Sequence, residues 1–139
     1  MINRRAVMTL NHRLYQTGRY TQSEALKTAW QLVKGMTLTA RGVSFGRRQE
    51  ALAHLAHYPR HLITLTLQHQ VHPADPQAVI IVATVAGKGS YPIGYTSREM
   101  AQSLAPLLDA GQAVSAAFKT VTGGREYGHY GLKLAVSVA

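Results

Sequence analysis

The sequence of 139 residues contains no cysteine and few acidic residues. The lack of cysteine excludes a disulfide framework, a thiolate zinc site, an iron–sulfur centre and a cysteine nucleophile. The 6 Asp and Glu stand against 15 Lys and Arg, which gives a formal net charge of +9. A chain of single-domain length with so few carboxylates has little means of acid–base catalysis, and we expect that it is not an enzyme.

Long apolar runs are also missing. The longest extends from Ala78 to Ala86 and is too short to cross a bilayer. Arg4 and Arg5 are not followed by the apolar stretch of a secretory signal, so we expect a cytoplasmic protein that does not bind membranes. No phosphate-binding loop pattern occurs, and the 7 histidines show no His-Glu-x-x-His spacing. We therefore expect no cofactor and no metal site.

The positive charge is concentrated in the first part of the chain. Residues 1–60 hold ten basic and two acidic residues, a net charge of +8, whereas residues 61–139 have a net charge of +1. A basic surface attracts polyanions, and nucleic acid is the polyanion that a small cytoplasmic protein most often meets. The alternative is that the charge serves solubility alone.

Residues 1–36 have the pattern of a basic helical hairpin. Apolar spacing predicts a helix over residues 3–16, and Thr21 and Glu24 form the capping box of a second helix that ends at Gly35. The apolar positions of this second helix are Leu26, Ala29, Trp30 and Val33. This stripe must be buried against the rest of the chain or against a partner, and we expect its tryptophan to lie in the core.

Beyond residue 36 the pattern changes to short strands with two short helices. We expect strands at 37–45, 62–70, 78–85, 91–95, 114–121 and 130–138, a helix at 47–57, and a second helix from a Thr96–Glu99 capping box through Asp109. The order β-α-β-β-β-α-β-β suits a small, partly open β-barrel rather than a doubly wound parallel sheet. We thus expect an α+β fold with a helical hairpin at 1–36 and a barrel domain at 37–139.

Two residues, Asp75 and Arg98, are candidate functional residues because the expected local structure does not fully explain either of them. Asp75 lies in a loop between two prolines, where its structural role would be to hydrogen-bond the loop backbone. Arg98 lies in the first turn of a helix that follows a strand ending at Tyr95. A cation there is unfavourable with the helix dipole, but it can join the exposed amides in holding a phosphate while Tyr95 stacks on a base. The alternative is a solvated Arg98 and a core Tyr95.

Four blocks in this region occur in the order of a known family. They are GVSFGRRQE (42–50), HPADPQAV (72–79), IGYTSREMA (93–101) and LAPLLDAG (104–111). Over about residues 37–122 the chain resembles the HIRAN domain, in its small bacterial or phage form, with an extra N-terminal hairpin. HIRAN domains also occur in eukaryotic helicase-like DNA-repair translocases. The resemblance implies an OB-like barrel with two helices that binds single-stranded DNA and has a pocket for the free 3′ end.

The resemblance also implies roles for individual residues. Phe45 matches the first-strand aromatic that holds a terminal base, and Asp75 matches the carboxylate that meets the 3′-hydroxyl. Tyr95 and Arg98 match the phosphate side of the pocket. The other residues that we expect to bind nucleic acid are Arg47, Arg48 and His72.

The chain departs from the family at four positions. His72 and Gln77 stand where the family has Asn, Ala74 stands where it has a stacking Tyr, and Ser44 stands where eukaryotic members have Arg. Our first hypothesis is a non-catalytic module that binds single-stranded DNA or 3′ DNA ends, alone or with a larger helicase or nuclease. The alternative is a protein-interaction or oligomerisation module that has lost this pocket and whose hairpin docks on another chain or a second copy.

Overall fold

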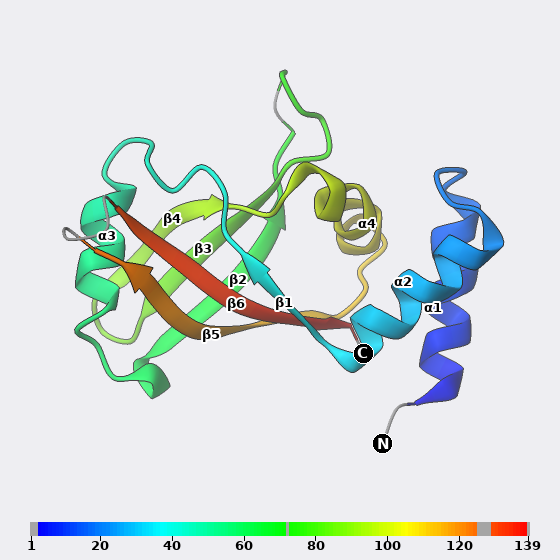
Figure 1. The fold of residues 1–139 in the computed structure, drawn as a ribbon, viewed down its shortest axis with the longest axis horizontal. Helices are drawn as coiled ribbons and strands as arrows, with labels where there is room; N and C mark the ends of the chain where they lie inside the picture. The colour runs from blue at the N-terminus through cyan, green and yellow to red at the C-terminus, as the bar shows by residue number, and fades with distance from the viewer. Residues whose placement is uncertain (1–2, 72, 125–128, 139) are drawn as a thin grey trace.

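The computed structural model describes residues 3–71, 73–124 and 129–138 (Figure 1). Within them lie four α-helices, one short 3-10 helix (60–62) and six strands. The elements are α1 (Arg4–Gln16), α2 (Gln22–Lys34), β1 (Met36–Thr39), α3 (Arg48–Leu55), β2 (Ile63–His69), β3 (Val79–Val85), β4 (Gly89–Tyr95), α4 (Arg98–Asp109), β5 (Val114–Gly123) and β6 (Tyr130–Val138). The predicted order of strands and helices after residue 36 is confirmed.

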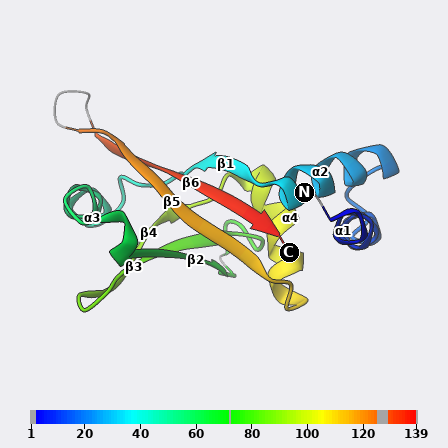
Figure 2. The same ribbon diagram turned by 90° about the horizontal axis from the view of Figure 1, so that it is seen from below.

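The six strands form one antiparallel sheet in the order β1-β6-β5-β2-β3-β4. The sheet curls so that β1 and β6 lie opposite β2 and β3 (Figure 2). Its edge strands approach one another just beyond β1, where Arg41 and Tyr95 form an isolated bridge. Each backbone N–H of this pair donates to the carbonyl of the other, at 2.7 and 2.8 Å. The fold is therefore α+β with a partly open barrel, as predicted.

A single hydrophobic core links the barrel to the hairpin. In β2 the apolar residues Ile63, Leu65 and Leu67 are buried while the intervening polar residues face solvent, which is the predicted two-residue alternation. From α1, Val7, Leu10 and Leu14 are buried in the same core. The side chains of Tyr20 and Arg13 also hydrogen-bond Ser103 and Gln112, so the hairpin is tied to α4 and to the segment that follows it.

The second hairpin helix is capped as predicted but buries a different face. Thr21 and Glu24 form both hydrogen bonds of the capping box, at 3.0 and 3.1 Å. The buried residues are Ala25, Ala29 and Leu32. Trp30 is 39% exposed, so the prediction that it lies in the core is wrong. The helix carries apolar residues on two overlapping faces, and the face with two alanines packs inward because small side chains allow close helix packing.

Two local boundaries also differ from the sequence prediction. The strand expected at 37–45 ends at Thr39, and positive φ angles at Gly42 and Gly46 turn the following segment into a loop. The α4 cap is Ser97, whose hydroxyl accepts from the Met100 N–H, so the predicted Thr96–Glu99 capping box is wrong. Both differences place loop residues next to the end of β4, where the candidate site lies.

Candidate functional site

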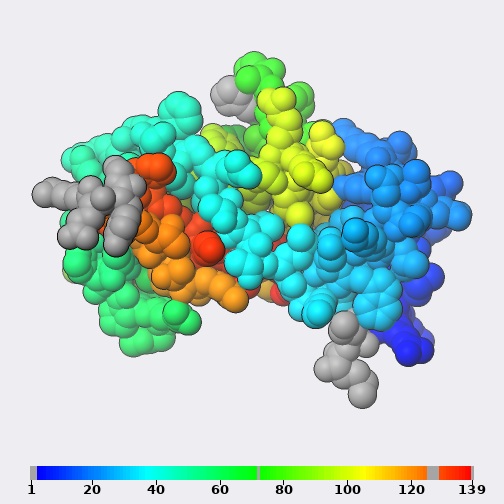
Figure 3. Space-filling model, viewed as in Figure 1, coloured from blue at the N-terminus to red at the C-terminus, as the bar shows by residue number. Residues whose placement is uncertain are grey.

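A pocket of about 580 Å³ lies where the two sheet edges meet. Five segments form it: the loop between β1 and α3, the start of α3, the loop between β2 and β3, the end of β4 and the start of α4. Figure 3 shows the β2–β3 loop projecting from the surface beside the first residues of α4. The lining residues are Phe45, Arg48, Ala74, Asp75, Ala78, Tyr95, Thr96 and Arg98.

The structure brings most of the predicted site residues together. Those that line the pocket are Phe45, Arg48, Asp75, Tyr95 and Arg98. Arg47 is not among them: its side chain is 79% exposed and forms an ion pair with Glu50 at 3.0 Å. His72 lies outside the described residues. Segments far apart in the sequence thus contribute two rings, two cations and a carboxylate to one pocket.

Arg48 organises the aromatic wall of this pocket. Its Nη1 donates to the Gly42 carbonyl at 2.7 Å. Its guanidinium carbon lies 5.1 Å from the centroid of the Tyr95 ring and 5.9 Å from that of Phe45. At these distances the cation is attracted by both ring faces. Phe45 remains 67% exposed, so its ring is accessible beside the pocket.

The loop that carries Phe45 is fixed by a glutamine of α3. The amide nitrogen of Gln49 donates to the carbonyls of Val43 and Tyr130, at 3.0 and 2.9 Å. The amide oxygen of Gln49 accepts from the Tyr130 N–H at 2.7 Å. One side chain therefore ties the loop to β6. Sequence reasoning missed this role, because nothing local to Gln49 indicates a partner more than eighty positions away.

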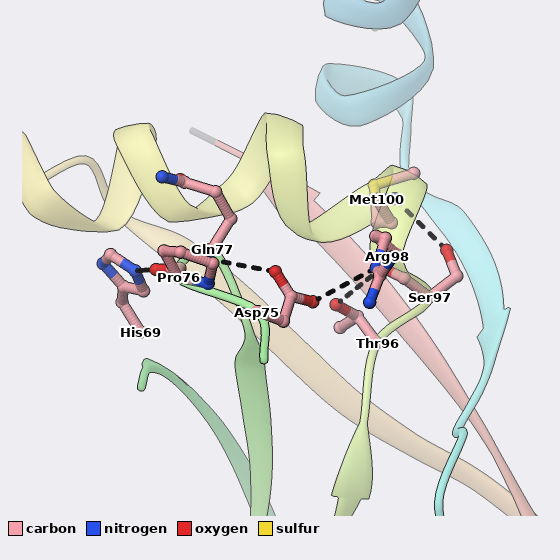
Figure 4. A network of polar contacts seen from close by, with 8 residues as sticks. All are labelled: His69, Asp75, Pro76, Gln77, Thr96, Ser97, Arg98 and Met100. Atoms are coloured by element: carbon pink, nitrogen blue, oxygen red, sulfur yellow. Dashed lines mark hydrogen bonds and ion pairs between the residues drawn. The ribbon is translucent and has the colours of Figure 1, made fainter. Parts of the chain in front are cut away.

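The β2–β3 loop supplies the carboxylate of the pocket, Asp75 (Figure 4). Asp75 Oδ1 accepts from the Gln77 N–H at 3.1 Å, and Oδ2 lies 3.7 Å from Arg98 Nε. The second distance is long for a hydrogen bond, and the Arg98 side chain is 73% exposed, so the ion pair is weak. An ionised carboxylate has about four acceptor positions. Asp75 thus retains the capacity to accept a hydrogen bond from a ligand hydroxyl.

A histidine holds the carboxylate-bearing loop against α4. His69, at the end of β2, has its Nε2 at 2.7 Å from the Pro76 carbonyl and its Nδ1 at 2.8 Å from Asp109 Oδ1. Both partners are acceptors, and only the imidazolium form has two N–H groups to donate. The Pro76 carbonyl first, and then the Asp109 carboxylate, raise the pKa of His69 above its ordinary value of 6.5. No pattern local to His69 predicts this role, because its two partners lie in the β2–β3 loop and at the end of α4.

We expect this histidine clamp to stabilise the fold more at acid pH than at alkaline pH. Because the pKa of His69 is raised in the folded state, its contribution is fully present below 6.5 and is lost as the pH rises through the higher folded-state pKa. Urea unfolding of the wild type and of His69→Gln, from about pH 5.5 to about pH 8.5, measures this contribution as a difference. The difference should shrink with rising pH; a constant difference would contradict the assignment.

Comparisons with known proteins place the chain in no family. No family model matches it, and no curated protein matches it. Among solved structures, a protein from Lactobacillus plantarum is similar over 72% of this chain and 89% of its own, with 23% sequence identity and a TM-score of 0.49. The HIRAN resemblance therefore stays a prediction.

Among the described residues, no helix combines the length and the apolar character needed to span a membrane. The same residues include no group of three or more histidine, aspartate or glutamate side chains placed to hold a metal ion.

Proposed function

We propose that this protein is a cytoplasmic, non-catalytic module that binds single-stranded DNA and holds its 3′ end in the pocket. The proposal rests on one observation, that a single pocket is lined by Phe45, Arg48, Asp75, Tyr95 and Arg98. Aromatic rings stack on bases without sequence preference, and guanidinium groups contact phosphates. A carboxylate with spare acceptor capacity accepts a hydrogen bond from a 3′-hydroxyl and repels a 3′-phosphate.

The remaining features of the chain agree with this proposal. The net charge of +9 favours sequence-independent attraction to phosphates, with an affinity that falls as salt rises. Ala74 lines the pocket where HIRAN domains have a stacking tyrosine. The loss of one base–aromatic stack weakens binding by about 1–3 kcal/mol. We therefore expect modest affinity, supplied mainly by Phe45, Tyr95 and the two arginines. We also propose that the module works alone or with a larger helicase or nuclease.

The experiment that tests the proposal compares two ends of the same strand. Fluorescence anisotropy with a short 5′-labelled single-stranded DNA should show tighter binding of the 3′-hydroxyl form than of the 3′-phosphate form. Asp75→Asn keeps the size of the side chain but removes its charge. The ratio of the affinities for the 3′-hydroxyl and 3′-phosphate strands should therefore fall by about tenfold, which corresponds to the loss of one charge-assisted hydrogen bond. Glu50→Gln removes the same charge outside the pocket and should leave the preference intact.

The other outcomes separate the parts of the proposal. Equal, salt-sensitive binding of both strands by the wild type would mean that the protein coats DNA and does not read its end. An unchanged preference in Asp75→Asn would remove Asp75 from the site. No binding of either strand even at low salt would overturn the proposed function.

A second candidate function rests on the hairpin. Its exposed large apolar residues are Met8, Tyr15, Leu26 and Trp30, of which Met8 and Trp30 are 57% and 39% exposed. Exposed apolar surface of this kind marks many protein–protein contacts. The hairpin is also basic, which favours an acidic partner chain over a second copy of itself. Absence of DNA binding at low salt would favour this interaction function.

A further inference from the structure

A second groove, of about 280 Å³, lies between α3 and the β3–β4 hairpin. Its floor is apolar, formed by Ala51 and Leu55 of α3 and by Ile93 of β4. Tyr91, Lys88 and His54 also line it. Among the described residues that line this groove none is acidic. The groove therefore combines an apolar floor, an aromatic ring and basic groups, which suits a polyanion with flat apolar parts.

The groove and the pocket lie on either side of the same loop. Phe45 of this loop lines the pocket. The next residue, Gly46, is close to Tyr91 of the groove: a Cβ placed at Gly46 would lie 3.9 Å from the Tyr91 hydroxyl. Because Gly46 has no side chain and adopts a φ of +57°, the ridge between the two hollows is low at this point. The Phe45–Gly46 segment therefore lies between the pocket and Tyr91, and Gly46 adds no side chain between them.

The spacing of the two tyrosines suits a nucleic-acid strand. Tyr91 and Tyr95 of β4 pair with Ala83 and Ile80 of β3, which are three residues apart because β4 has a bulge between the two tyrosines, so they lie about 10 Å apart along the strand. Stacked nucleotides are about 3.4 Å apart, so roughly three of them cover this distance, and fewer do so in an extended strand. Tyr91 is 40% exposed, so its ring is open to a stacking partner.

We propose that the Tyr91 groove is a second base-binding subsite, which takes the nucleotides that precede the 3′ end held in the pocket. Tyr91 stacks on a base and Lys88 contacts a phosphate there. This inference rests on the proposed function, because it supposes that the 3′ end of the strand occupies the pocket. It adds a direction: the strand runs from the pocket over the Phe45–Gly46 ridge toward α3.

The test measures affinity against strand length. A dinucleotide with a 3′-hydroxyl should occupy the pocket alone, whereas an octanucleotide should fill both sites and bind more tightly. Tyr91→Leu should weaken binding of the octanucleotide by about tenfold and leave the dinucleotide unchanged. Tyr91→Phe, which keeps the ring, should bind both as the wild type does. Lys88→Gln should reduce the salt dependence for the octanucleotide by about one phosphate contact.

Tyr15→Leu is the matched control, because Tyr15 is similarly exposed, at 46%, but lies on α1. It should leave binding of both oligonucleotides unchanged, and equal urea midpoints should show that each variant is folded. If Tyr91→Leu weakens both lengths equally, or neither, the subsite is overturned while the proposed function stands. Failure of both oligonucleotides to bind would overturn the subsite together with the proposed function.

Discussion

Arg48→Met is expected to weaken binding of single-stranded DNA by about 10–100-fold, the equivalent of about 1.5–3 kcal/mol for one hydrogen bond to a charged group. The guanidinium lies beside the Phe45 and Tyr95 rings and is bound to the Gly42 carbonyl. Its removal deletes a cation from the pocket wall and also the contact that holds the loop. Arg48→Lys keeps the charge without the planar donor group, so we expect an intermediate affinity.

The neighbouring arginine supplies a matched control. Arg47→Met removes the same charge one position away, but Arg47 is highly exposed, pairs with Glu50 and does not line the pocket. It should reduce affinity only about two- to threefold, through weaker long-range attraction. Anisotropy titrations of the two variants at two salt concentrations measure the difference. Equal losses in Arg47→Met and Arg48→Met would mean that charge alone, and not the pocket, binds the DNA.

Most of the fold can be predicted because local patterns and the packed structure agree. The alternation in β2 and the capping box of α2 are properties of a few adjacent residues, and both occur in the structure. The prediction of a buried Trp30 is wrong because α2 has two apolar faces. Which of these faces is buried depends on which one fits against α1. The sequence of a helix alone does not contain that information.

The candidate site is less predictable, because it depends on contacts between distant segments. Asp75 and Arg98 can be noted from their local context, and the family resemblance adds Phe45 and Tyr95. Their common location depends on the sheet register and on the turns of the loop after β1, which replaces a predicted strand. The supporting side chains Gln49 and His69 could not be predicted, because each joins segments that are separate in the sequence.

The closure of the barrel beneath the pocket depends on a residue without a side chain. A Cβ at position 94 would lie 2.8 Å from the Arg41 carbonyl oxygen, 3.2 Å from a methyl of Val43 and 3.3 Å from Ala40 Cβ. Gly94 does not have a positive φ, so the reason for glycine here is space and not backbone conformation. The carbonyl it would clash with accepts from the Tyr95 N–H in the bridge between the sheet edges. An added methyl group therefore pushes these edges apart.

We expect Gly94→Ala to lower the free energy of unfolding by about 1–3 kcal/mol, as overpacking does in other well-packed sites. Gly87→Ala is the control: its Cβ meets nothing within 4 Å, so it adds only the strain of a positive φ. Urea unfolding gives the two losses, and amide exchange locates them. Faster exchange at Arg41 and Tyr95 in Gly94→Ala, but not in Gly87→Ala, would link closure to this close approach. Because Tyr95 also lines the pocket, Gly94→Ala should weaken DNA binding as well. Amides that stay protected in Gly94→Ala would contradict the role of this close approach in closure, and faster exchange with unchanged affinity would show that the bridge does not shape the pocket.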